Sequence, residues 1–110
     1  MIVAFSVAPS GTPTGEAAGT GDDASVHTAV AAAVKVVRDS GLPNRTSSMF
    51  TEIEGDWDEV MDVVKRATEA VGRYGSRVSL VLKADIRPGH TGELTGKVAR
   101  LEGALGTLAE

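Results

Sequence analysis

The sequence contains no cysteine among its 110 residues, and only 4% of the residues are aromatic. The lack of cysteine excludes disulfides, thiolate nucleophiles and cysteine-ligated metal or iron–sulfur sites. Basic residues are also few, with 11 Lys and Arg against 15 Asp and Glu, and they are scattered along the chain. The basic surface that nucleic acid requires is therefore missing, and we expect no nucleic-acid partner.

Long apolar runs are absent as well. None approaches the ~20 residues of a membrane span, and the opening MIVAFSVAP lacks the charged leader of a signal peptide, which predicts a cytoplasmic protein with no membrane partner. Hydrophobic residues nevertheless make up 42% of the chain, which indicates a folded protein rather than a disordered one. We expect a single domain, 1–110, small enough that it often needs a partner subunit.

The spacing of apolar residues predicts seven elements in the order β-α-β-β-α-β-α. The first six predict a ferredoxin-like βαββαβ sandwich of the α+β class, with two helices on one face of an antiparallel sheet. An extra C-terminal helix, residues 92–109, carries an apolar stripe that should pack at the edge or against another subunit. Strands are expected at 2–9, 44–50, 51–55 and 78–87, helices at about 25–40 and 57–74, and a Gly/Thr-rich flexible loop at 10–23.

Alternation along the strands and helical spacing elsewhere also predict which residues form the core. The strand residues expected there are Val3, Phe5, Val7, Ile53, Leu80, Leu82 and Ile86. The helix residues are Val26, Val30, Ala33, Val37, Trp57, Val60, Val64, Ala67, Val71 and Tyr74.

The stretch SMFTEIEGDWDE places five carboxylates between Glu52 and Glu59. Asp56 and Glu59 have the spacing of a capping box, with Asp23 or Ser25 as the cap expected for the first helix. Asp58 would lie in the first turn of the second helix, where the helix dipole favours an anion. Glu52 and Glu54 flank Ile53 and should face away from the core, so capping does not explain them.

No pattern in the sequence indicates catalysis or a metal. His27 and His90 have no partner at helical spacing, and a calcium-loop motif, a G-x-S-x-G elbow and a complete phosphate loop are all missing. We therefore expect a protein that is not an enzyme and that has no metal and no cofactor.

The sheet face away from the predicted helices offers a candidate ligand site. Small residues on the first strand leave a hollow there, and hydroxyls, carboxylates and one aromatic ring surround it, as in small-molecule sites. The alternative is a second sheet from another subunit, and both can be true together. If the bend near Phe50 does not invert the register, the residues on this face are Ala4, Ser6, Ala8, Thr46, Ser48, Phe50, Glu52, Glu54, Val81, Lys83, Asp85 and Arg87.

Three motifs in order give the chain a family resemblance. They read Ser6-Val-Ala-Pro9, Thr51-Glu-Ile-Glu-Gly55 and Leu82-Lys-Ala-Asp-Ile-Arg87. The chain thereby resembles the YkoF-like thiamine-binding protein family, whose members carry S-x-x-P, T-x-I/V-E-G and I-K-x-D-x-R at these places. It departs from the family at Ser48-Met-Phe-Thr51, where members tend to have Pro-Met-Gly-Thr, and in its longer first loop.

The resemblance implies a ferredoxin-like homo-oligomer, often a tetramer, that binds thiamine or its hydroxymethylpyrimidine part without catalysis. It points first to Ser6 and Thr46 as ligand contacts, and then to Ser48, Lys83 and Asp85. Phe50 could stack on a pyrimidine ring or fill the hollow.

Two other hypotheses stay open beside the small-molecule binding protein. One is a structural or regulatory oligomerisation domain whose open sheet face is consumed by subunit contacts. The other is a cofactor-free ferredoxin-like enzyme, for which Glu52 or Asp85 beside Lys83 is the candidate acid–base set.

Overall fold

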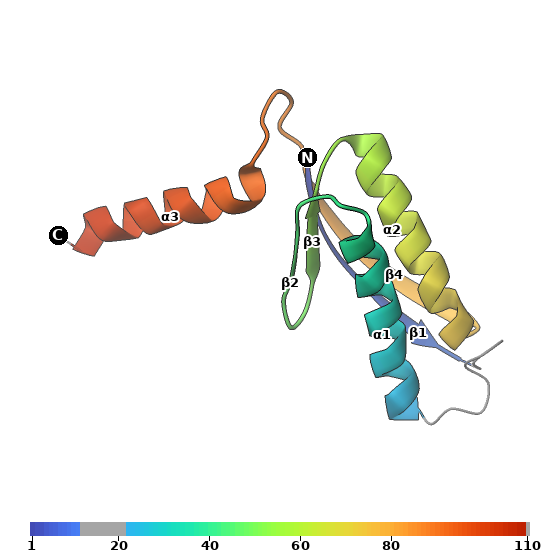
Figure 1. The fold of residues 1–110 in the computed structure, drawn as a ribbon. Helices are drawn as coiled ribbons and strands as arrows, with labels where there is room; N and C mark the ends of the chain where they lie inside the picture. The colour runs from blue at the N-terminus through green and yellow to red at the C-terminus, as the bar shows by residue number, and fades with distance from the viewer. Residues whose placement is uncertain (12–21, 110) are drawn as a thin grey trace.

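The computed structural model describes residues 1–11 and 22–109. It contains a four-stranded antiparallel sheet in the order β2-β3-β1-β4, which is the ferredoxin-like arrangement predicted from the sequence. Helices α1 and α2 cover one face of this sheet, and α3 extends away from it (Figure 1). The strands are β1 (Ile2–Ser10), β2 (Asn44–Thr46), β3 (Thr51–Glu54) and β4 (Arg77–Asp85); the helices are α1 (Asp22–Asp39), α2 (Trp57–Val71), the short 3-10 helix η2 (Gly72–Tyr74) and α3 (Glu93–Ala109).

The core lies between the sheet and the two helices. Val3, Phe5, Val7 and Ile53 are buried as predicted, because alternate strand residues face α1 and α2. Helix α2 contributes the predicted Val60, Val64, Ala67 and Val71, joined by Val63, and α1 contributes Ala29, Ala33 and Val37.

Five of the residues predicted to lie in the core are instead exposed. Val26 and Val30 lie on the rim of α1, where Ala29 takes the inner position instead. Trp57 is 56% exposed because it opens α2 beyond the end of the sheet. Ile86 is 58% exposed because β4 ends at Asp85, before the predicted limit, and Leu80 within that strand is also exposed.

The predicted helix caps differ from those observed. Asp56 does hold the N-cap position of α2, but its side chain makes no capping hydrogen bond, so the capping box is wrong. Helix α1 begins at Asp22, which places Asp23 and Ser25 inside the helix rather than before it. Most of the predicted loop 10–23 lies outside the described residues.

The central hairpin is shorter than predicted, and this changes which residues face the helices. Residues 47–50 form the turn between β2 and β3, where the Ser47 N–H donates to the Phe50 carbonyl at 2.9 Å. Register pairs Arg45 with Glu52 and Thr46 with Thr51. Because Glu52 is on the open face, Arg45 shares that face and Thr46 belongs to the other one. The predicted placement of Thr46, Ser48 and Phe50 on open-face strand positions is therefore wrong.

Helix α3 matches its predicted range, and it is the least covered element of the described chain. Its first two turns contact the body, with Leu94 buried and Lys97 paired with Asp85, whereas the later apolar residues face solvent, and Leu101 and Leu108 are 57% and 81% exposed. The described chain measures 56 × 32 × 20 Å, and α3 accounts for its elongation (Figure 1). None of the described helices is long and apolar enough to cross a membrane.

Candidate functional site

Four of the six predicted ligand contacts line one cavity, which we call the hairpin cavity. It has a volume of about 220 Å³ and lies between β1, the 47–50 turn and the middle of α1. Ser6, Thr46, Ser48 and Phe50 are the predicted residues in its wall. The other residues of the wall were not predicted as ligand contacts: Phe5, Val7, Ala8, Val30, Ala33, Ser47, Met49 and Thr51.

The hairpin cavity exists because β1 is longer than β3. Pairing between these strands runs only from Ile2–Glu54 to Phe5–Thr51, whereas β1 continues along β4 as far as Ser10. Beyond Phe5, no strand in the described part of the chain pairs with β1 on the β3 side. From Ser6 onward, alternate backbone N–H and C=O groups of β1 therefore have no strand partner on that side. They lie beside the hydroxyls of the 47–50 turn.

The polar side chains of the hairpin cavity share one chemistry. Its polar side chains are all hydroxyls, which both donate and accept hydrogen bonds, and the described lining contains no carboxylate, amine or imidazole. Ser47 shapes the turn because its hydroxyl donates to the Phe50 carbonyl at 3.0 Å and accepts from the Phe50 N–H at 3.3 Å. Phe50 is thereby held at the cavity wall.

Lys83 and Asp85 lie elsewhere, in a second cavity that we call the α3 cavity. It also has a volume of about 220 Å³ and lies between the open sheet face and the first turns of α3. Its lining consists of Ile2, Ala4, Glu52, Lys83, Asp85, Glu93, Leu94, Lys97 and Val98. The structure therefore divides the six predicted residues between two cavities.

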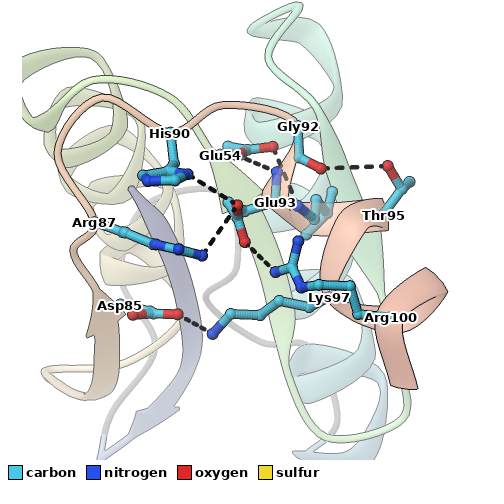
Figure 2. A network of polar contacts seen from close by, with 10 residues as sticks. Glu54, Asp85, Arg87, His90, Gly92, Glu93, Thr95, Lys97 and Arg100 are labelled. Atoms are coloured by element: carbon cyan, nitrogen blue, oxygen red, sulfur yellow. Dashed lines mark hydrogen bonds and ion pairs between the residues drawn. The ribbon is translucent and has the colours of Figure 1, made fainter. Parts of the chain in front are cut away.

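A polar network holds α3 against the sheet at this cavity (Figure 2). The Glu54 carboxylate accepts hydrogen bonds from the backbone N–H groups of Glu93 at 2.8 Å and Leu94 at 3.3 Å. These are the first N–H groups of α3, which have no partner inside the helix. Glu54, buried at the end of β3, therefore caps a helix almost forty residues later in the chain, and Lys97 of α3 forms an ion pair with Asp85 of β4.

Glu93 is the centre of the network. Its carboxylate accepts a hydrogen bond from Arg100 at 2.6 Å and lies 3.8 Å from both Arg87 and His90. The Arg100 hydrogen bond lowers the pKa of the Glu93 carboxyl; burial opposes this shift, and the charges of Arg100, Arg87 and His90 reinforce it. The sequence signal that could have pointed to the network was Glu54, a carboxylate that no local capping pattern explained.

A third cavity, of about 330 Å³, lies beside the start of α2 and is lined in part by Trp57, Ile86, Arg87 and His90. Its walls come from the turn that leads to α3, in which Gly89 and Gly92 have positive φ angles that side chains disfavour. No group of three or more His, Asp or Glu residues suited to a metal ion occurs among the described residues.

The hairpin cavity combines apolar walls with a few hydroxyls, the mix that is common in small-molecule sites. The chain belongs to the family described as thiamine-binding protein, whose model matches residues 3–102. This finding agrees with the resemblance drawn from the three motifs.

The chain is also similar to individual proteins and solved structures. A UPF0045 protein of Mycobacterium bovis is 53% identical over 103 residues, covering 93% of this chain and 91% of the relative. A hypothetical protein of Methanocaldococcus jannaschii has a solved structure with a TM-score of 0.74 at 28% identity, covering 92% of this chain and 94% of that one.

A Thermotoga maritima protein, assigned provisionally to thiamine biosynthesis or salvage, has a TM-score of 0.69. It is 24% identical and covers 91% of this chain and 96% of its own. At that identity the likeness shows a shared fold.

Proposed function

We propose that this protein binds thiamine or its hydroxymethylpyrimidine moiety in the hairpin cavity, without converting it chemically. The observation that carries the proposal is the convergence of Ser6, Thr46, Ser48 and Phe50 on one cavity of a chain that belongs to the thiamine-binding protein family. The relative assigned provisionally to thiamine biosynthesis or salvage is consistent with the same ligand class.

The cavity chemistry suits an aminopyrimidine. Such a ring is flat and carries hydrogen-bond donors and acceptors on its edge, which hydroxyls and an open strand edge can both satisfy. The apolar walls from Phe5, Val30 and Ala33 would cover the ring, and Phe50 offers an aromatic face for stacking. Because the described lining has no titratable acid or base, binding without catalysis is the function it favours.

The test is calorimetric titration of the purified protein with thiamine and, separately, with hydroxymethylpyrimidine. We expect saturable binding near one ligand per chain. Ser6→Leu should weaken it by about tenfold or more, because the larger side chain would occupy space at the cavity wall. Ser79→Leu is the matched control, since Ser79 is an exposed β4 residue outside the cavity lining.

Two results would count against the proposal. If a folded protein gave no binding heat with either compound, the proposed ligand class would be wrong. If Ser6→Leu bound the ligand with unchanged affinity, the hairpin cavity would not be the binding site.

We further propose that the chain assembles into a homo-oligomer, with a tetramer favoured by the family resemblance. The observation behind this is the exposed apolar stripe of α3 beyond the α3 cavity, formed by Leu101, Leu105 and Leu108. A helix with such a stripe is stabilised when another surface buries it. If the chain formed a tight oligomer but bound no pyrimidine, a structural oligomerisation role would replace ligand binding as its function.

A further inference from the structure

We propose that the α3 cavity is a second binding site, for a small zwitterion that carries an anionic group and an amine at its two ends. The inference rests on the charges that line this cavity and on which of them are already neutralised. It is independent of the thiamine proposal, because none of the residues that line the α3 cavity belongs to the hairpin cavity.

Most of the charges in the α3 cavity have partners. Lys97 is paired with Asp85, and Glu93 is paired with Arg100. Two charged side chains of the lining, Glu52 and Lys83, form no ion pair with any described residue, although both project from the open sheet face. Arg45 stands opposite Glu52 in the register, yet these two side chains are not ion-paired either.

The register sets the distance between the two free charges. Glu52 of β3 and Lys83 of β4 both pair with Ala4 of the central strand β1. Their Cα atoms are therefore two strand spacings apart, roughly 10 Å. Because both side chains are long, their charged ends can approach a ligand of a few atoms that lies between them over Ala4.

The remaining walls favour a ligand with an apolar middle. Ile2 and Ala4 form the floor, and Leu94 and Val98 of α3 form the roof, so a short methylene chain would be covered on both sides. A carboxylate or phosphate would bind Lys83 and an ammonium would bind Glu52 through charge-assisted hydrogen bonds. A ligand with one charge would leave the opposite protein charge without a partner in a partly enclosed cavity.

The test uses 4-aminobutyrate and 6-aminohexanoate as probes, with butylamine and butyrate as single-charge controls. Binding is followed by amide chemical shifts in nitrogen-15 spectra of the full chain. We expect a saturable shift confined to residues around Ala4, Lys83 and Leu94 for at least one zwitterion. The single-charge compounds should bind about tenfold more weakly or not at all.

Substitutions test whether Glu52 and Lys83 each contribute to zwitterion binding. Glu52→Gln and Lys83→Gln should each weaken zwitterion binding by about tenfold or more, whereas Glu69→Gln and Lys65→Gln, exposed charge removals on α2, should leave it unchanged. The double exchange Glu52→Lys with Lys83→Glu should restore binding, because the ligand can reverse its direction. Ser6→Leu should have no effect on these probes.

Three outcomes would overturn the proposal. One is the absence of saturable shifts at the α3 cavity with either zwitterion. Another is equal binding of butylamine or butyrate, which would mean that a single charge is recognised. The third is unchanged zwitterion affinity in both single variants, which would place the binding elsewhere.

Discussion

Glu54 shows how one side chain can connect two distant parts of this fold. It ends the edge-proximal strand β3 with its carboxylate buried, and both of its oxygens accept N–H groups from the first turn of α3. A carboxylate at this position satisfies helix donors and also lies at the positive end of the helix dipole. The start of α3 is therefore attached to the sheet rather than only to the preceding turn.

Removing this carboxylate should loosen α3. We expect Glu54→Ala to destabilise the docked first turn of α3 by about 1–2 kcal/mol, as in losses of helix caps, and Glu54→Gln to cost less because one acceptor oxygen remains. Hydrogen exchange at the amides of Glu93 and Leu94 measures the change directly. Glu59→Gln is the control, because Glu59 is exposed on α2. Unaltered exchange in Glu54→Ala would show that the turn before α3 holds the helix by itself.

Phe50 lies in a turn, although the sequence placed it in a strand. The alternation of side chains suggested that it belonged to a strand, but the hydrogen bonds between Ser47 and Phe50 close a turn there instead. Phe50 nevertheless lines the hairpin cavity, because the turn folds over the uncovered part of β1. The predicted register of Phe50 was wrong, as the pairing of Thr46 with Thr51 shows, and its role as a ligand contact stays a prediction.

At the scale of elements, α3 is joined to the body by a network with a charged centre. The pKa of Glu93 is lowered in the folded protein, chiefly by its hydrogen bond to Arg100. A lowered folded-state pKa means that the carboxylate contributes stability above its ordinary value of 4.5 and that this contribution is lost as the pH falls through the folded-state value. Docking of α3 should therefore weaken in acid.

This pH dependence can be measured on α3 alone. We expect amide exchange in the first turn of α3, corrected for its intrinsic pH dependence, to show falling protection when the pH is lowered from 6 to below 4. Glu93→Gln should have reduced protection at pH 6 and a flatter pH profile, because a neutral amide does not titrate. Arg66→Gln, which removes only the exposed pair with Asp62 on α2, serves as the control. An equally steep profile in Glu93→Gln would assign the effect to another group.

At the scale of the whole molecule, the extended α3 is the feature on which the proposed homo-oligomer rests. Because α3 contacts its own body only through its first two turns, the rest of its apolar stripe is exposed to water, which is costly for a helix of 17 residues. The open sheet face also lacks a described cover along Ala8 and Val81, both of which are exposed. A second copy of the chain would bring the two kinds of surface together, with symmetry providing each copy with the same cover.

We expect the double variant Leu101→Glu/Leu105→Glu to dissociate the oligomer, because it places charges in the centre of the stripe. Light scattering should show the wild type at a multiple of the monomer mass and the variant at the monomer mass. Ala99→Glu adds a single charge on the other side of α3 and should leave the assembly intact. A wild type that is monomeric at high concentration would contradict the proposed assembly.

The sequence by itself determined the order of the elements, the helix-covered face of the sheet and most of the core, because periodicities of 2 and 3.6 depend only on neighbouring residues. It also predicted Ser6, Thr46, Ser48 and Phe50 as ligand contacts, and that role stays a prediction. Tertiary structure decided where β2 and β3 turn, which face Thr46 joins, and that Lys83 and Asp85 lie in a different cavity from Ser6. It also decided that Glu54 caps α3, because that contact joins residues 39 and 40 positions apart, which no local pattern records.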